Sequence, residues 1–334
     1  MTVLDGAKVL VTGGTGFIGS NLLLRLLSTG CRIRATLHKR PAVIQDDCIE
    51  YVNADLTLMD DCKRVVEEVD FVFMCAANTS GAAVIAATPL VHVTPNVVMN
   101  AQMLEAAYFA KVKKFVFISS SAAYPPTGDR PVREDELFDG EPYESYYCAG
   151  WMKRYSEILC KIYAQKIKHP MAAVVIRPSN VYGPYDDFDF RTSHMMAALM
   201  RRAVERHKPL EVWGTGDDVK DLIYVDDFLD GLLLAFEHAS DYLAVNIAAG
   251  QGYSVRQVLQ TILEVDGYTD ADVRFDPSKP TMIPIRLIDT SYARVRLGFQ
   301  AKTSLPDGVL KTITWYRQSV SGVMKKGSIV PSQM

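Results

Sequence analysis

The chain has 334 residues, of which 49% are hydrophobic and 22% charged, and a formal net charge of -3 at pH 7. This size allows a large core in one large or two moderate domains and argues against a disordered chain. Lys and Arg are spread along the sequence without a block of like charge, so we expect no nucleic-acid partner. No run approaches the roughly 20 apolar residues that span a bilayer, and no secretory leader is evident, so we expect no membrane partner and a cytoplasmic protein.

The cysteines and histidines suggest neither a metal site nor a disulfide framework. No two cysteines form a C-x-x-C motif, and none of the six histidines stands close to another in the sequence. The pattern favours reduced thiols in or near a core, and we predict no metal. The cysteines are Cys31, Cys48, Cys62, Cys75, Cys148 and Cys160.

In the first half of the chain, short β-rich apolar runs alternate with longer segments of helical period. The runs are AKVLVTG, CRIRATL, DFVFMCAA, KKFVFISS and AAVVIRP, and segments such as SNLLLRLLSTG, DCKRVVEEV and AQMLEAAYFAKV stand between them. This alternation is typical of a parallel sheet with helices on both faces. It predicts an α/β fold with a Rossmann-type doubly wound parallel sheet, and a dinucleotide-binding domain over residues 1–178.

After Pro178 the pattern becomes mixed. It predicts a helix near residues 194–205, a short strand at EVWG, a helix after Asp226, a strand at VNIAAG and a helix over residues 254–265. We interpret this half as a smaller α/β substrate domain over residues 179–330, interleaved with the first domain. The last eight or so residues are typical of a loose tail.

The segment VTGGTGFIGSNLL places Gly13, Gly14, Gly16 and Gly19 between the first predicted strand and the first predicted helix. The first two allow a tight turn, Gly16 lets the backbone approach a pyrophosphate at the helix N-terminus, and Gly19 allows close packing of helix on strand. Such glycines alone can be purely conformational. At the start of an alternating β/α pattern they predict dinucleotide binding.

The end of the second predicted strand indicates which dinucleotide binds. A protein that uses NAD usually carries an acidic residue there, which bonds the ribose 2′-hydroxyl. The segment RATLHKR offers His38, Lys39 and Arg40 instead. A cationic cluster suits a 2′-phosphate, so we predict NADP, with NAD as the alternative if these are ordinary solvated loop charges. Asp55, after the third strand, is either an adenine contact or a turn aspartate.

Four motifs together resemble the extended short-chain dehydrogenase/reductase family, the NAD-dependent epimerases and dehydratases that modify nucleotide sugars. They are VTGGTGFIGS, SSSAAYPP at the end of the run KKFVFISS, GWMKRYSE and RPSNVYGP. The resemblance covers nearly the whole chain, and AANTSGAAVI, EVWGTGDD and FDPSKPTMIPIRLIDTS are similar to segments of GDP-L-fucose synthases and GDP-mannose 3,5-epimerases. It implies a homodimer, and further cofactor contacts at Phe17, Ile18, Leu56, Ala76 and Ala77.

The family's chemistry uses a serine, a tyrosine and a lysine. The tyrosine exchanges a proton with a sugar hydroxyl as hydride passes to or from nicotinamide, while the lysine binds the ribose and lowers the tyrosine's pKa. By the resemblance, Ser120 matches the serine and Lys153 matches the lysine and would also contact the cofactor. The tyrosine position is Ala149, which cannot carry a proton.

Tyr146 and Tyr147 lie seven and six residues before Lys153, which displaces them around the helix from the required face. Three interpretations of Ala149 stay open. We favour an engineered Tyr→Ala variant of an active enzyme, because the surrounding motifs are intact. The others are a natural enzyme that uses Tyr147 or a different acid, and a non-catalytic dinucleotide-binding sensor or scaffold.

Ala122 and His194 bear on the reaction. Family dehydratases carry an acidic residue, and 3,5-epimerases a cysteine, at the position of Ala122. Without a base there, hydride transfer at sugar carbon 4, as in a 4-epimerase or 4-keto reductase, is the more economical reaction. If Ala122, like Ala149, results from engineering, an enzyme that both epimerises and reduces the sugar is again an open interpretation. His194 matches a histidine that acts as an acid in the fucose synthases, and could equally be a polar side chain at a helix start.

The resemblance also implies a set of substrate contacts, with guanosine as the favoured base. Ser121 and Ala122 would lie beside the sugar, cations suit the diphosphate, and an aromatic ring can stack on the base. Lys220 stands where the family commonly has arginine, which puts a bidentate phosphate contact in doubt, and Trp213 could be a core or rim aromatic. The residues implied in the second domain are Asn180, Arg202, Trp213, Lys220 and Arg286.

Overall fold

The computed structural model describes residues 3–79, 88 and 90–321. The predicted C-terminal tail and the end of the predicted substrate domain lie outside the described residues, and so does part of the AANTSGAAVI segment.

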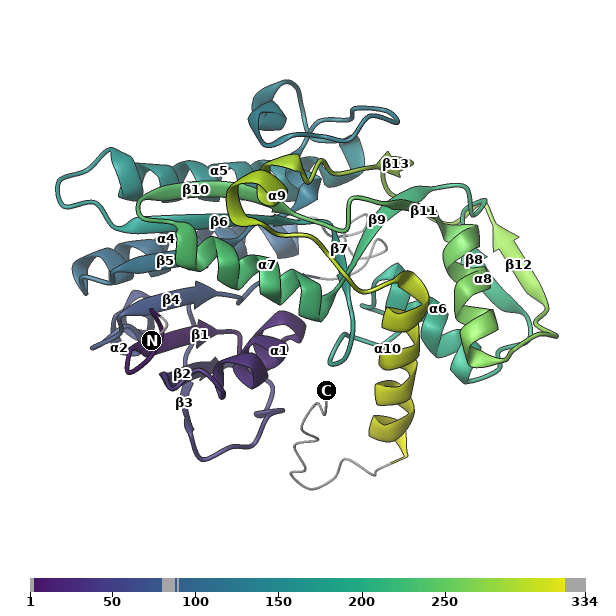
Figure 1. Cartoon of the computed structure of the whole chain (residues 1–334), viewed down its shortest axis with the longest axis horizontal. Coiled ribbons are helices and arrows are strands. Elements are labelled where there is room, and N and C mark those ends of the chain that lie inside the picture. The colour runs from purple at the N-terminus through teal and green to yellow at the C-terminus, as the bar shows by residue number, and fades with distance from the viewer. Residues whose placement is uncertain (1–2, 80–87, 89, 322–334) are drawn as a thin grey trace.

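A seven-stranded sheet forms the larger lobe (Figure 1). All its neighbouring strands pair in parallel, in the order β3-β2-β1-β4-β5-β6-β10. Strand order reverses between β1 and β4, where ligands bind in doubly wound sheets. The predicted fold class is confirmed. The strands are β1 (Lys8–Thr12), β2 (Arg32–Leu37), β3 (Ile49–Asn53), β4 (Phe71–Met74), β5 (Lys114–Ile118), β6 (Ala172–Pro178) and β10 (Tyr242–Ile247).

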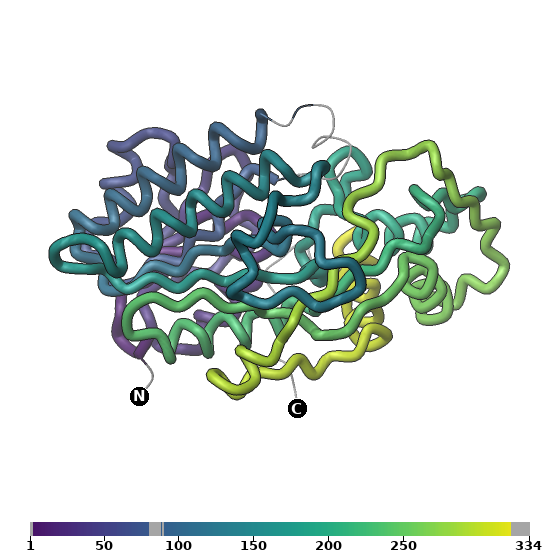
Figure 2. The backbone as a smooth tube through the Cα atoms, turned by 90° about the horizontal axis from the view of Figure 1, so that it is seen from above, coloured from purple at the N-terminus to yellow at the C-terminus, as the bar shows by residue number. Residues whose placement is uncertain are grey.

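Helices cover both faces of this sheet. On one face α1 (Phe17–Leu26) packs beside α7 (Val225–His238), and α9 (Ser291–Leu297) contacts α7 and β10. The other face carries α2 (Met59–Val65), α4 (Leu90–Phe109) and α5 (Tyr147–Gln165), and Figure 2 shows α4 and α5 running side by side. Both faces are therefore buried, which explains why the strands read as continuous apolar runs.

The smaller lobe lies beyond the carboxyl ends of the large sheet's strands (Figure 1). Here β9 pairs with β7, β11 and β13, and β8 pairs in parallel with β12. Its elements are β7 (Asn180–Tyr182), β8 (Leu210–Trp213), β9 (Val219–Tyr224), β11 (Gly252–Ser254), β12 (Val273–Asp276), β13 (Ile285–Arg286), α6 (Met195–Val204), α8 (Val255–Asp266) and α10 (Leu305–Val320). Three short 3-10 helices lie on the loops of the larger lobe: η1 (Ser121–Ala123), η2 (Glu134–Phe138) and η3 (Glu144–Tyr146).

Local signals explain where α8 begins and ends. The Ser254 hydroxyl accepts a hydrogen bond from the Gln257 backbone N–H at 3.1 Å, and the Gln257 side chain accepts one from the Ser254 N–H at 2.8 Å. This reciprocal cap satisfies two backbone donors at the helix start. Gly267, at φ 67°, ends the helix in the left-handed conformation that glycine tolerates. The helix predicted over residues 254–265 therefore lies within one residue of the observed one.

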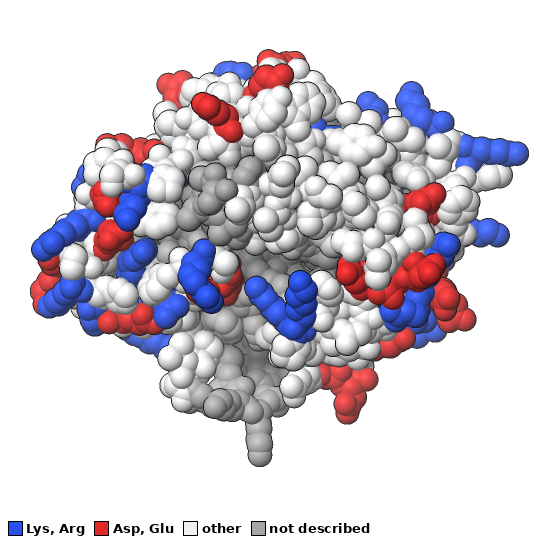
Figure 3. Space-filling view, turned by 180° about the vertical axis from the view of Figure 1, so that it is seen from behind, with Lys and Arg blue, Asp and Glu red and all other residues white. Residues whose placement is uncertain are grey.

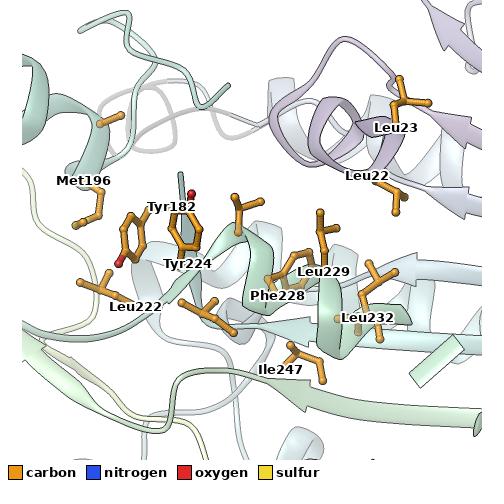
Figure 4. Close-up of a cluster of buried hydrophobic side chains, with 14 of the residues drawn as sticks. Leu22, Leu23, Tyr182, Met196, Leu222, Tyr224, Phe228, Leu229, Leu232 and Ile247 are labelled. Carbon is orange, nitrogen blue, oxygen red and sulfur yellow. The ribbon is translucent and has the colours of Figure 1, made fainter. Parts of the chain in front are cut away.

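The main hydrophobic core joins the two halves of the sequence. Leu22 of α1 lies in the same buried cluster as Phe228 and Leu232 of α7 and Ile247 of β10 (Figure 4). The cluster continues into the smaller lobe, where the rings of Tyr182 and Tyr224 meet with their centroids 5.8 Å apart. Since α7 and β10 come from the C-terminal half, that half completes the larger lobe. The division at residues 178 and 179 stays a prediction.

Candidate active site

The glycine turn after β1 has the geometry of a phosphate-binding loop. Gly13 has φ 65°, and a Cβ there would lie 2.8 Å from the Cα of Ala76. A Cβ on Gly19 would overlap the Gly13 carbonyl oxygen, so α1 packs directly on the turn. The first turn of α1 carries no acidic residue, and its N-cap Gly16 makes no side-chain cap. The free N–H groups there, which include those at the predicted positions Phe17 and Ile18, suit a pyrophosphate.

The predicted adenosine contacts gather at the ends of β2, β3 and β4. His38, Lys39 and Arg40 are exposed directly after β2, and His38 Nε2 lies 3.8 Å from a carboxylate oxygen of Asp55. The other Asp55 oxygen accepts hydrogen bonds from the Thr57 hydroxyl at 2.6 Å and backbone N–H at 3.0 Å, and these bonds lower the pKa of Asp55. Asp55 is therefore ionised and fixed in orientation. Leu56 is buried beside it, the Ala76 N–H donates to Thr12, and Ala77 is exposed.

Lys153 lies at the carboxyl end of β5. Its ammonium donates to the carbonyl oxygen of Ile118, the last residue of β5, at 2.7 Å. Burial lowers the pKa of Lys153 to about 8, although the charge of Glu157 opposes this change. Ser120 follows two residues after Ile118, and its hydroxyl accepts from the Ala122 N–H at 3.1 Å. The structure therefore places Lys153 and the Ser120 segment at the same end of β5.

A buried ion pair supports this end of the sheet. The Arg177 guanidinium donates to Glu157 through Nη2 at 2.7 Å, and the Ser119 hydroxyl also donates to Glu157. Arg177 further donates to the Tyr124 hydroxyl at 2.8 Å, and that hydroxyl donates to Asn246 of β10 at 2.7 Å. Sequence reasoning used Glu157 only as a motif match and missed Arg177. The usable signal was an arginine within an otherwise apolar strand, which needs a buried partner.

Ala149 lies in the first turn of α5, where that helix meets η1. A Cβ on the next residue, Gly150, would lie 2.9 Å from the Ala122 carbonyl oxygen, so the two backbones are in close contact. Tyr147 is half exposed. Tyr146 is partly buried, and burial raises its pKa to about 12 while the positive charge of Arg286 opposes the rise.

Three of the predicted substrate residues gather around β9. Arg286 lies opposite Lys220 in the pairing of β13 with β9. The Arg286 guanidinium donates to the carbonyl oxygens of Tyr124 at 3.1 Å and Pro125 at 2.9 Å, and its Nε is buried without a partner. The Lys220 ammonium donates to the Ile283 carbonyl and lies 3.4 Å from Asp218. Asn180 donates to the Asp221 carbonyl at 3.0 Å.

A second group lies on β8 and α6 of the smaller lobe. Trp213 donates from its indole nitrogen to Glu211 at 3.0 Å, and the charge of Glu211 acts on Arg202, whose pKa is lowered mainly by burial. The Arg202 guanidinium also lies 4.9 Å from the centre of the Phe190 ring. Glu211 therefore interacts with both Trp213 and Arg202. Glu211 is a polar residue that the sequence reasoning did not select.

His194 lies in the loop between β7 and α6, directly before the first residue of α6. Burial among the surrounding residues lowers the pKa of His194, and the charge of Asp187 opposes this effect; the residue still keeps an exposed surface. Asn21 of α1 donates to the Pro184 carbonyl at 2.8 Å, which ties this loop to the cofactor helix. Burial raises the pKa of Asp186 in the same loop to about 7. No hydrogen bond or ion pair within the described part of the chain joins His194 to Ser120.

The described residues contain no group of three or more His, Cys, Asp or Glu side chains that could hold a metal ion. Within the same residues, no helix is long and apolar enough to cross a membrane. On the face shown in Figure 3, Lys and Arg side chains lie among Asp and Glu side chains.

Comparison with known proteins gives relatives along almost the whole chain. GDP-L-fucose synthase of Sinorhizobium fredii is 29% identical over 97% of this chain and 98% of its own length. GDP-mannose 3,5-epimerase 1 of Oryza sativa subsp. indica is 28% identical over 96% of this chain and 84% of its own length.

Solved structures are also similar to this chain. The UDP-glucose 4-epimerase of Thermotoga maritima with UDP-glucose has a TM-score of 0.83 at 26% identity, covering 94% of this chain and 99% of that one. MoeE5 in complex with UDP-glucose and NAD has a TM-score of 0.82 at 27% identity, covering 94% of this chain and 99% of that one. The resemblance inferred from the motifs is confirmed by the family model for NAD dependent epimerases and dehydratases, which matches residues 9–248. The chain belongs to the NAD dependent epimerase/dehydratase family.

Proposed function

We propose that this chain binds NADP together with a nucleotide-diphosphate sugar, with a GDP-sugar favoured. Its site is built for hydride transfer at sugar carbon 4, as an epimerase, a 4-keto reductase or both. The observation that carries the proposal is the Lys153 ammonium, fixed on the Ile118 carbonyl where β5 ends, beside Ser120. This end of the sheet also carries the glycine turn, so cofactor and sugar would meet at Lys153.

The preference for NADP rests on the end of β2. No acidic residue follows that strand directly, and among the described residues Lys39 and Arg40 take part in no ion pair. Two exposed cations are then available to a 2′-phosphate, which offers oxygens for charge-assisted hydrogen bonds. NAD remains the alternative, since the same cations could be solvated loop charges.

Substrate contacts are proposed along the smaller lobe. Lys220 and Arg286 would bind the diphosphate, with Asn180 close by on β7. The base would lie near Trp213 and Arg202, which offer an aromatic ring and a cation. The sugar would lie beside Ser120, Ser121 and Ala122, at the carboxyl end of β5.

The proposed catalytic residues are Ser120, Lys153 and His194, at a site that lacks its usual proton carrier. Ser120 would bond a sugar hydroxyl and Lys153 the cofactor's ribose, while His194, in the loop before α6, would act as the acid of an epimerisation rather than of the hydride transfer. Ala149 offers no acidic hydrogen, so hydride transfer at carbon 4 would have no partner for the hydroxyl proton. We therefore infer that the chain holds its ligands and turns them over poorly.

Replacing Ala149 by Tyr tests this function. A tyrosine at position 149 should raise the rate of hydride transfer by about 100-fold or more, because a positioned proton carrier contributes on that scale. The rate is followed by the absorbance of reduced nicotinamide, with NADPH and NADH compared and GDP- and UDP-sugars supplied. Ala149→Phe is the matched control, since it adds the ring without the hydroxyl. Equal rates for the two variants would refute the function.

Two other functions are favoured by specific observations. Ala149 itself favours a dinucleotide-binding sensor or scaffold, which would bind cofactor and a partner protein but no sugar nucleotide. Asp186 lies in the loop that Asn21 ties to α1, and burial raises its pKa to about 7, which favours a native sugar 4-epimerase that uses another proton carrier. In that case the unmodified chain would convert its substrate, and Asp186→Asn would abolish that activity.

We also propose a homodimer that associates through α4 and α5, and a cytoplasmic location. The support for the dimer is the apolar surface of these helices, on which Phe109 is 72% exposed and Tyr155 is 49% exposed. Apolar patches of this kind mark association surfaces on many proteins. Sedimentation of the purified chain would show whether it is a dimer.

A further inference from the structure

Segment 119–123, which carries the proposed catalytic serine, is hydrogen-bonded at both ends to the same helix. At its start, the Ser119 hydroxyl donates to the carboxylate of Glu157. At its end, the Arg154 guanidinium donates from Nε to the carbonyl oxygen of Ala123 at 2.7 Å. Arg154 and Glu157 both belong to α5 and stand three residues apart, so they lie on one face of that helix.

These two contacts enclose Ser120 and fix it relative to Lys153. Lys153 belongs to the same helix, and its ammonium donates at 2.7 Å to the carbonyl oxygen of Ile118, directly before the segment. The Ser120 hydroxyl accepts from the Ala122 N–H at 3.1 Å, which leaves its proton to donate to a ligand oxygen. A shift of segment 119–123 along α5 would therefore move the Ser120 hydroxyl relative to Lys153.

The carboxylate of Glu157 is itself held in place. Arg177 of β6 donates to it from Nη2 at 2.7 Å and from Nε at 3.1 Å, and both side chains are buried. The same guanidinium donates from Nη1 to the Tyr124 hydroxyl at 2.8 Å, one residue past the segment. An ion pair with two hydrogen bonds fixes orientation as well as distance. The start of segment 119–123 is thus anchored to β6 as well as to α5.

Arg154 occupies a position that is unfavourable for a charge. The residue is 1% exposed, burial lowers its pKa, and its Nη2 is buried without a hydrogen-bond acceptor. The centres of the Trp151 and Phe138 rings lie 4.8 and 5.4 Å from its guanidinium carbon. A buried donor without an acceptor costs free energy. The arrangement therefore favours a role for Arg154 in placing η1 over a role in stabilising the fold.

We propose that Arg154 is a positioning residue, which together with Glu157 holds the Ser120 hydroxyl in place for the sugar of a nucleotide-diphosphate sugar. This inference rests on the proposed function and adds to it a residue that acts through η1. In the sequence, Arg154 directly follows Lys153 and looks like one more solvated charge on a helix.

The experiment is a calorimetric titration of the full chain, saturated with NADP, with GDP-mannose or UDP-glucose, whichever the unmodified chain binds more tightly. Arg154→Met keeps an apolar stem and removes the donor to Ala123. Ser119→Ala removes the donor to Glu157 and leaves the ion pair of that carboxylate intact. Each variant should raise the dissociation constant of the sugar nucleotide about 3- to 10-fold, the range for loss of one hydrogen bond. Affinity for NADP and for the nucleoside diphosphate without sugar should not change.

A double-mutant cycle with Ser120→Ala separates positioning from a general structural effect. Ser120→Ala alone should weaken binding of the sugar nucleotide about 3- to 10-fold. If Arg154 acts through Ser120, adding Arg154→Met to the Ser120→Ala protein should change its affinity by less than about 1.5-fold. Arg294→Met, at an exposed arginine of α9, is the matched control and should bind as the unmodified chain does.

The outcomes separate this inference from the function on which it rests. If the unmodified chain binds a sugar nucleotide and either Arg154→Met or Ser119→Ala binds it equally well, the inference is wrong and the proposed function stands. The inference is also wrong if Arg154→Met weakens binding equally with and without Ser120, or weakens binding of NADP and the nucleoside diphosphate as well. An unchanged affinity in Ser120→Ala would overturn both the inference and the proposed role of that serine. If the unmodified chain binds neither sugar nucleotide, the proposed function fails and the inference fails with it.

Discussion

At the scale of single residues, the site keeps a lysine in an environment that opposes its charge. Burial lowers the pKa of Lys153 from 10.5 to about 8. The unfolded chain therefore binds more protons than the folded chain between those two values, and this residue makes stability rise with pH across that window. Below about pH 8 the buried ammonium exerts its full destabilising effect. Residues kept for function often carry such a cost.

Lys153→Met should therefore stabilise the protein. We expect the free energy of unfolding to rise by about 1–3 kcal/mol at neutral pH, because a methionine has no charge to desolvate. The gain should shrink as the pH rises toward about 10, where the lysine is neutral in the folded state. Urea unfolding at both pH values measures it. Lys166→Met, at an exposed lysine directly after the same helix, should change stability by less than about 0.5 kcal/mol. A variant less stable than the parent at both pH values would contradict the argument.

At the scale of elements, the contact between α5 and η1 fixes the site. Ser120 caps η1 and Lys153 lies on α5, so their relative position depends on how closely these two elements approach. Gly150 permits that approach, because any Cβ there would lie 2.6 Å from the Pro142 Cβ and 2.9 Å from the Ala122 oxygen. In the sequence this glycine looks like an ordinary, slightly unfavourable helix residue. Its function becomes visible only once η1 is placed against the helix.

Gly150→Ala is accordingly expected to destabilise the protein. Alanine is the better helix former, yet the added methyl group must push α5 away from η1 and Pro142. We expect a net loss of about 1–3 kcal/mol in the free energy of unfolding, as for other overpacked sites. Cys148→Ala, two residues earlier in the same turn, adds no atom and should be close to neutral. Denaturant unfolding of the two variants gives the comparison, and a more stable Gly150→Ala protein would refute the close contact.

Part of this arrangement of elements could be predicted from the sequence. The strands and the α8 helix were predictable because buried parallel strands are continuous apolar runs and caps are local signals. The positions of Lys153 and Ser120 followed from the motifs. A pair that forms only through tertiary folding was not predictable: Arg177 and Glu157 come from different elements, and no local pattern links them.

At the scale of the whole molecule, the larger lobe depends on the C-terminal half of the chain. The outermost strand β10 pairs with β6 along six residues, from Tyr242–Ala173 to Ile247–Pro178. Helix α7 covers the face of the sheet on which Phe71 and Phe73 are buried, and the Phe236 ring lies 5.0 and 5.1 Å from their rings. The sheet and its covering layer are therefore completed by residues far along the chain.

A fragment of residues 1–178 should consequently fail to fold as a cooperative unit. It would leave the hydrogen-bonding edge of β6 open and the apolar face under α7 exposed, and both promote association with other chains. We expect weak near-ultraviolet dichroism, no sharp denaturant transition and aggregation. A fragment of residues 1–248, which contains α7 and β10, should show a clear gain in cooperativity. Because the two fragments differ by the segment that carries α7 and β10, a cooperative transition in the shorter one would show that β1–β6 and their helices suffice for the larger lobe.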